Sequence, residues 1–139
     1  MKYLANDDRK ELVHPLREKL HITNIEKIDG KIYFNIKEDR SLQGLHPKGH
    51  MLVDSDENAF VYILENDHEY IYVYFQEHLW TEISSQLNES NKFFVSKDIS
   101  IELERFYDEL TYLLDNIKDN HNYGETFVEK VERIFFVSE

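Results

Sequence analysis

The densest group of potential metal ligands lies between residues 54 and 65. Counted from Asp54, side-chain oxygens fall at positions 1, 3, 5 and 12, on Asp54, Asp56, Asn58 and Glu65. This is the ligand spacing of a calcium loop, and hard cations prefer oxygen ligands. Position 6 is Ala59, where the sharp turn of such a loop requires glycine. Despite this difference, the spacing makes Asp54, Asp56 and Asn58 a candidate metal site. The alternative is a turn whose Asp and Asn side chains bond their own backbone.

The remaining residues do not form a recognisable catalytic motif. His46 and His50 have the i, i+4 spacing of zinc ligands on a helix, but Pro47 and Gly49 between them disfavour a helix there. Four glycines are too few and too scattered for a phosphate-binding or dinucleotide loop. The chain has no cysteine, so it has neither a thiolate metal site nor a cysteine nucleophile. We predict no catalytic residue and no cofactor.

Aromatic residues alternate along two neighbouring segments. Tyr70, Tyr72 and Tyr74 share one face of an expected strand, and Phe60, Tyr62 and Leu64 form a similar set on the preceding strand. Paired, the two sets predict a tyrosine-rich face, and tyrosine is enriched at protein interfaces. Tyr62, Tyr70, Tyr72 and Tyr74 are therefore candidate interaction residues. In the alternative, a helix covers this face and the tyrosines belong to the core.

A third polar cluster occupies residues 115–125. Its carboxylate and amide oxygens could hold a cation or a polar ligand. The same residue types also end one helix and begin the next, with Asn122 as the N-cap and Glu125 at the third helical position. The structural interpretation is favoured here.

The elements that must position these residues follow from periodicity and turn chemistry. Residues 20–28 and 31–36 flank Asp29-Gly30, which predicts a β-hairpin. Short apolar runs at 51–53, 60–64 and 70–75, separated by polar links, predict an antiparallel meander.

The second half of the chain has mainly helical periodicity. Apolar positions predict helices over 77–88 and about 104–118, and a last helix that carries Val128, Val131 and Phe135. Residues 93–103 suggest one more hairpin, turning at Lys97-Asp98. The predicted fold is α+β, a mainly antiparallel sheet of about five to seven strands packed with three helices, two of them C-terminal.

Length and composition predict one domain. We expect residues 20–139 to form it and residues 1–19 to be an N-terminal extension, with a short helix over 6–14 that Pro15 interrupts. No apolar run approaches the roughly 20 residues of a membrane span, and the N-terminus lacks a secretory signal. A cytoplasmic location is expected.

Charge is distributed unevenly along the chain. The formal net charge is −12. Residues 1–40 hold nine basic and eight acidic side chains, whereas residues 41–139 hold seven basic and twenty acidic ones. Such a field repels phosphate backbones and anionic lipids, so we expect no nucleic acid and no membrane as partner. It favours a basic protein, although acidity also serves solubility alone.

Several strings together resemble a known group of proteins. They are Gly49–Asp56, which contains Met-Leu-Val-Asp-Ser-Asp, then Ala59–Tyr62, Trp80, Asp108–Tyr112, Asp115–Ile117 and Asn122–Gly124. The chain resembles an uncharacterised family of small acidic proteins of Bacillota, over about residues 20–136, with His50 where Gln is expected. The resemblance implies a bacterial cytosolic setting, and no activity or catalytic residue carries over from it.

Two classes of function stay open on this basis. The favoured one is a non-enzymatic interaction module that binds a basic protein through its acidic surface and the tyrosine face. The alternative is a carboxylate-based metal- or ligand-binding protein or enzyme, with Asp54, Asp56 and the 115–125 loop as candidates. A homodimer that buries an edge strand or the tyrosine face is a further alternative.

Overall fold

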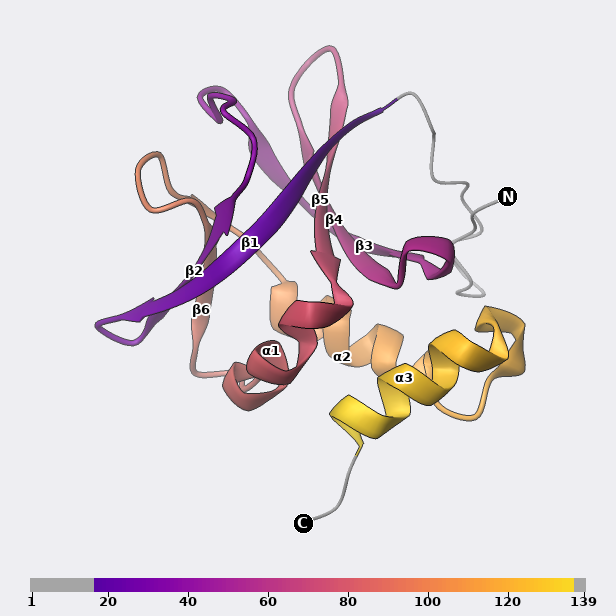
Figure 1. The fold of residues 1–139 in the computed structure, drawn as a ribbon. Coiled ribbons are helices and arrows are strands. Elements are labelled where there is room, and N and C mark those ends of the chain that lie inside the picture. The colour runs from indigo at the N-terminus through magenta and orange to yellow at the C-terminus, as the bar shows by residue number, and fades with distance from the viewer. Residues whose placement is uncertain (1–16, 137–139) are drawn as a thin grey trace.

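The computed structural model describes residues 17–136. The expected helix over residues 6–14 lies outside this range, so it stays a prediction. The first strand begins at Glu18, two residues before the expected start of the domain. Figure 1 shows a strongly curved sheet with three helices gathered on one side of it.

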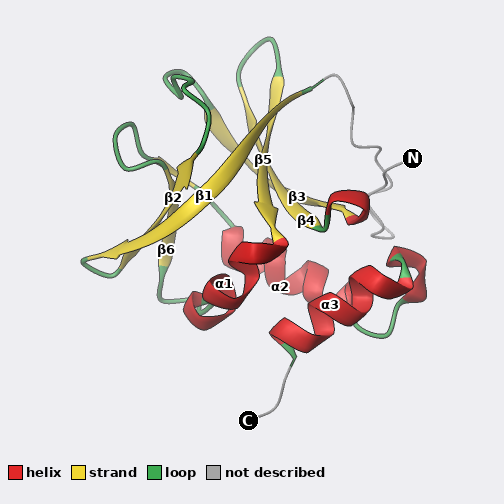
Figure 2. Ribbon diagram, viewed as in Figure 1, coloured by secondary structure: helices red, strands yellow, loops and turns green. Residues whose placement is uncertain are grey.

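Seven strands form a single sheet, as Figure 2 shows. They are β1 (Glu18–Ile28), β2 (Lys31–Ile36), β3 (His46–Asp54), β4 (Ala59–Glu65), β5 (Tyr70–Gln76), β6 (Lys92–Val95) and β7 (Ile101–Glu102). Their order across the sheet is β3-β4-β5-β1-β2-β6-β7. Short turns join the successive strands β3, β4 and β5, so the predicted meander is confirmed.

The sheet is mainly antiparallel, as predicted, but it is mixed rather than purely antiparallel. The β1–β2, β3–β4, β4–β5 and β6–β7 pairs are antiparallel, but β5 pairs with β1 and β6 pairs with β2 in parallel. Alternating residues mark a strand but do not specify a distant partner, so the sequence could not show these two pairings.

The turn between β1 and β2 follows the predicted chemistry. Asp29 and Gly30 have φ angles of 51° and 79°. Two successive positive φ angles define the hairpin turn whose twist matches the flanking strands, and Asp-Gly is a preferred pair for it. The predicted hairpin is confirmed.

Three helices match the predicted ones, with small differences at their ends. They are α1 (Trp80–Gln86, preceded by a 3₁₀ turn at Glu77–Leu79), α2 (Phe106–Ile117) and α3 (Glu125–Phe135). The expected cap of the last helix is wrong, because Gly124 occupies the N-cap of α3 without a side-chain bond. Within the described chain, no helix is long and apolar enough to cross a membrane.

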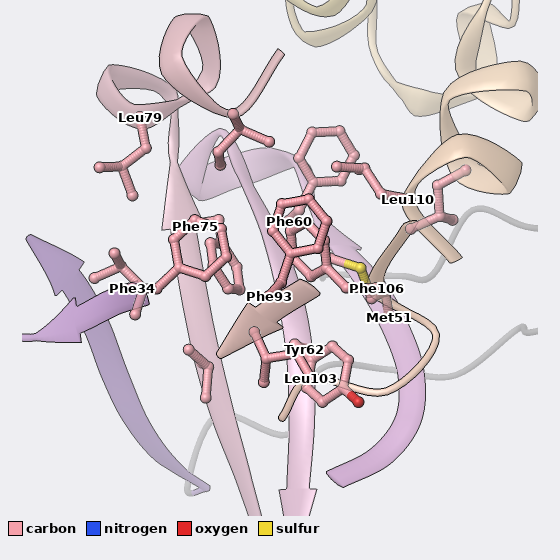
Figure 3. Packing of buried hydrophobic residues seen from close by; sticks show 14 of the residues in the cluster. Phe34, Met51, Phe60, Tyr62, Phe75, Leu79, Phe93, Leu103, Phe106 and Leu110 are labelled. Atoms are coloured by element: carbon pink, nitrogen blue, oxygen red, sulfur yellow. The ribbon is translucent and has the colours of Figure 1, made fainter. Parts of the chain in front are cut away.

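The main core lies between the sheet and the three helices, and Figure 3 shows part of it. Phe106 of α2 packs on Phe93 and Phe75, with ring centroids 4.6 and 5.4 Å apart. Trp80 packs on Phe60 at 5.3 Å, and its indole N–H donates to the Phe75 carbonyl at 3.0 Å. Such aromatic pairs fix helix positions beyond what area burial alone supplies. These contacts hold the helices against the inner face of the sheet.

Candidate functional site

Asp54, the first of the predicted metal ligands, is completely buried at the end of β3. One of its carboxylate oxygens accepts a 2.7 Å hydrogen bond from the Tyr74 hydroxyl. The other accepts from the Glu57 amide at 3.2 Å and caps the 3₁₀ turn Ser55–Glu57. Burial raises the pKa of Tyr74, and the bond to the Asp54 carboxylate raises it further. This geometry gives Asp54 a structural role.

The other two predicted metal ligands occupy different positions in the same turn. Asp56 is exposed, and Asn58 adopts the left-handed conformation that ends the turn, with φ 49°. Over residues 17–136, no three His, Asp or Glu side chains are grouped so that they could hold a metal ion. The metal site at Asp54, Asp56 and Asn58 therefore stays a prediction.

The predicted tyrosine face divides between the two faces of the sheet. In the β4–β5 ladder, Tyr62 lies opposite Val73, and Tyr74 lies opposite Val61. Directly paired residues point to the same side, so Tyr62 belongs to the inner face, whereas Tyr70, Tyr72 and Tyr74 share the outer one. The expectation of a single face is thus wrong for Tyr62, because the register is offset by one residue. An interaction role for the four tyrosines stays a prediction.

These tyrosines are largely buried. Tyr62 is 0% exposed, and its hydroxyl donates to the Glu104 carbonyl at 2.7 Å. Burial raises its pKa well above the ordinary value. Tyr72 and Tyr74 are 4% and 1% exposed and pack in a second cluster on the outer face.

Helix α2 is attached to the sheet through a buried carboxylate that the sequence did not reveal. Glu109 is 1% exposed and accepts the Met51 amide hydrogen at 3.0 Å. Met51 follows an irregular stretch of the β3–β4 ladder, so a side chain of α2 supplies an acceptor there. Arg105 and His50 lie 3.7 and 3.9 Å from the Glu109 carboxylate. This contact fixes which side of α2 faces solvent.

The solvent-facing side of α2 carries carboxylates around an exposed tyrosine. Asp108 and Asp115 of α2 are exposed, as are Glu104 before the helix and Asp119 after it. Tyr112 is 39% exposed, one of the three large hydrophobic residues with marked exposure in the described chain. Asp108, Tyr112 and Asp115 follow the i, i+4, i+7 spacing of one helix face. These three residues form what we call the α2 stripe.

The two basic residues that flank α2 in the described sequence, Arg105 and Lys118, have other partners. Arg105 pairs with the buried Glu109, and the Lys118 ammonium lies 5.0 Å from the centre of the Phe136 ring. The last turn of α2 contains no basic residue, although the negative end of the helix dipole favours one there. Asp115 therefore lies in an unfavourable position for a negative charge.

The 115–125 loop has the structural role favoured from its sequence. The Asn120 side chain accepts the Asn122 amide hydrogen at 3.1 Å and caps a 3₁₀ turn at His121–Tyr123. The Glu132 carboxylate accepts the Asp119 amide hydrogen at 2.8 Å. The oxygens of this loop thus stabilise the connection between α2 and α3.

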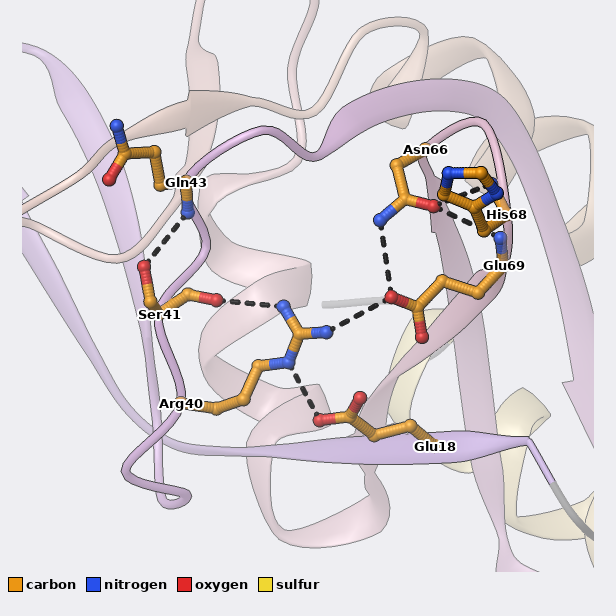
Figure 4. Close-up of polar contacts among 7 residues, drawn as sticks. All are labelled: Glu18, Arg40, Ser41, Gln43, Asn66, His68 and Glu69. Carbon is orange, nitrogen blue, oxygen red and sulfur yellow. Dashed lines mark hydrogen bonds and ion pairs between the residues drawn. The ribbon is translucent and has the colours of Figure 1, made fainter.

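An open groove of about 580 Å³ lies at the other end of the sheet, between β1, β2 and the 96–99 turn. Several of its charged residues are paired with one another. The Lys97 ammonium donates to Glu26 at 3.1 Å and lowers the pKa of that carboxyl. At its rim, Arg40 bonds the Glu18 and Glu69 carboxylates at 2.9 and 3.4 Å, as Figure 4 shows. Ion pairs within the protein therefore occupy much of the charged lining of this groove.

Sequence reasoning missed Tyr112, Arg105 and Glu109 as residues of interest. The signal for Tyr112 was present, because the apolar positions of the predicted helix leave 108, 112 and 115 on the opposite side. The contact between Glu109 and Met51 joins positions 58 residues apart, and no local pattern encodes it.

Comparison with known proteins places the chain among related sequences. Residues 20–135 match the model of UPF0738, a family of unknown function. A UPF0738 protein of Geobacillus thermodenitrificans is 41% identical over 123 residues, which cover 87% of this chain and 98% of that protein. One from Bacillus licheniformis is 48% identical over 90 residues, 64% of this chain and 74% of that protein. No solved structure matches the chain.

Proposed function

Because the chain belongs to UPF0738, a family of unknown function, we propose its role from the structure: it is a cytoplasmic protein-interaction module without catalysis. Its docking surface is the α2 stripe, and its partner is a protein with a basic segment. The observation that carries the proposal is an exposed tyrosine, Tyr112, that shares one face of α2 with the exposed carboxylates of Asp108 and Asp115.

The chemistry of the α2 stripe suits such a partner. A tyrosine ring supplies contact area at low entropic cost, and it also attracts cations to its face. Carboxylates around it steer a basic chain toward the ring and discriminate against acidic competitors. Asp108 and Asp115 are seven residues apart, or about 10 Å along the helix, a spacing that suits several basic residues on one segment.

The unfavourable position of Asp115 supports the same proposal. A negative charge in the last turn of a helix costs about 0.3–1 kcal/mol, and the described chain offers it no basic neighbour in that turn. A partner that supplies positive charge recovers this energy on binding.

The test is affinity capture of the tagged protein from a lysate of its host at low and high salt. Asp108→Asn/Asp115→Asn and Tyr112→Ala are compared with Glu82→Gln/Glu89→Gln, which makes the same change in charge at exposed sites of α1 and the turn after it. We expect one stoichiometric basic partner that is lost at high salt. Tyr112→Ala should weaken its binding at least about tenfold, and the α1 control should leave binding unchanged. Equal binding by the stripe and control variants, or no captured partner at either salt, contradicts the proposal.

A further inference from the structure

The outer face of the sheet carries a second hydrophobic cluster, separate from the main core. Its members are Leu52, Ala59, Val61, Ile63, Tyr72 and Tyr74, and each is between 0% and 4% exposed. All three helices contribute to the main core instead. Over residues 17–136, no helical residue belongs to this outer cluster. Sheet residues alone cannot exclude water from their own outward side, so their burial requires a cover.

The described chain begins at the edge of this outer cluster. Tyr70 packs against it, and the Arg17 guanidinium lies 5.0 Å from the centre of the Tyr70 ring. Glu18, the next residue, begins β1 opposite Ile71 and is held by Arg40, which also bonds Glu69. The point at which the preceding segment leaves the sheet is therefore fixed next to the apolar face.

The preceding segment has the length and composition to cover that face. Strands β4 and β5 contain seven residues each, so the face is about 23 Å long. Sixteen residues span about 35 Å even with nine of them helical. Apolar side chains are concentrated in the segment at Tyr3, Leu4, Leu12, Val13 and Leu16.

The far end of the face is also suited to a cover that excludes water. The Tyr74 hydroxyl and the Asp54 carboxylate bond each other at 2.7 Å, so the most polar groups there are mutually satisfied. Lys19 and His21 flank the Tyr74 ring on the β1 side, with the Lys19 ammonium 5.1 Å from its centre. The apolar surface thus ends in a defined polar border.

We propose that residues 1–16 of the same chain fold back over the outer cluster and form a third layer of the domain. The segment lies outside residues 20–135, which match the family. The outer face is therefore an intramolecular docking site, distinct from the α2 stripe, and its occupant is this chain's own N-terminal segment.

The first test places a spin label on the full-length protein. The chain has no cysteine, so Lys10→Cys carries the only label. We expect selective broadening of the amide signals of Val61, Ile63 and Tyr72, which is unchanged on dilution. The control label at Glu89→Cys, in the exposed turn after α1, should broaden signals of α1 and β6 instead. Absence of outer-face broadening from Lys10→Cys overturns the proposal. So does broadening that persists between labelled and unlabelled copies in a mixed sample, because the occupant is then a second copy.

The second test measures accessibility of the outer face with an apolar fluorescent dye. Leu12→Ser/Val13→Ser/Leu16→Ser should raise dye fluorescence several-fold and speed amide exchange in β4 and β5, with far-ultraviolet circular dichroism retained. Arg9→Ser is the matched control, and it should leave both readouts unchanged. Equal dye binding by the triple variant, the control and the wild type overturns the proposal.

Discussion

At the scale of single residues, two buried carboxylates form hydrogen bonds that connect separate parts of the fold. Asp54 bonds Tyr74 and the turn after β3, and Glu109 bonds the Met51 amide. Each joins elements that are distant in sequence. Because a buried polar group that loses its partner costs more free energy than the bond itself supplied, the two sites should respond strongly to substitution.

The Asp54–Tyr74 pair is testable by a double-mutant cycle. We expect Asp54→Ala to lower the free energy of unfolding by about 2–4 kcal/mol. The substitution leaves the buried Tyr74 hydroxyl without its acceptor and removes the cap of the 3₁₀ turn Ser55–Glu57. Tyr74→Phe should cost about 1–3 kcal/mol, and the double variant should cost clearly less than the two together. Urea unfolding measures each value. Asp56→Ala, at an exposed position, is the control and should stay within about 0.5 kcal/mol. Additive costs would show that the two side chains are not coupled.

Glu38 predicts a pH-dependent contribution to stability. Burial acts to raise its pKa, but hydrogen bonds from the His21 ring and backbone outweigh burial and hold the pKa below 4.5. A carboxyl with a lowered pKa stabilises the fold above its unfolded pKa, and this contribution is lost as pH falls through the folded pKa. We expect Glu38→Gln to cost about 1 kcal/mol at pH 7 and almost nothing at pH 3, as measured by urea unfolding. A cost that does not vary with pH would exclude the ionised Glu38 carboxylate and its hydrogen bonds to His21 as its origin.

At the scale of elements, α2 combines an inward anchor with an outward charge pattern. Glu109 faces β3, while Asp108 and Asp115 face solvent near opposite ends of the helix. The same substitution at the two exposed positions should therefore have opposite effects on stability.

Asp115→Asn should raise the free energy of unfolding by about 0.3–1 kcal/mol, because it removes a negative charge from the negative end of the helix dipole. Asp108→Asn should lower it by a similar amount, because Asp108 lies in the favourable first turn. Thermal unfolding at low salt measures both, and added salt should shrink both effects. Effects of the same sign would contradict an origin in the helix dipole.

The local elements were predictable from the sequence because their signals are local. Asp29-Gly30 specifies its own hairpin, and the apolar positions of α2 specify its buried face. The parallel pairings and the Glu109 contact depend on partners more than 50 residues away. The side of the sheet that Tyr62 faces depends on the exact register between β4 and β5. Two-residue periodicity identifies a strand, but it does not specify the neighbouring strand. It therefore does not show which residues pack against each face of the strand.

At the scale of the whole molecule, the net charge of −12 acts against the folded state. Like charges repel more strongly in the folded protein than in the expanded chain. We therefore expect the midpoint of thermal unfolding to rise by roughly 4 °C, or about 1 kcal/mol, between low salt and moderate salt. Asp108→Asn/Asp115→Asn should show a smaller rise, and a falling midpoint would mean that the described ion pairs outweigh the repulsion.

The parallel seam between β1 and β5 has a consequence for the order of folding. Glu18 pairs with Ile71 and Lys31 with Lys92, so each seam closes a chain loop of more than fifty residues. The β1–β2 hairpin and the β3–β4–β5 meander have only short loops to close and can form early. Pairing the hairpin with the meander costs most of the loop-closure entropy, so this step should limit the refolding rate. Substitutions at the seam, such as Leu20→Ala, should therefore slow refolding more than equally destabilising ones at the ends of α3.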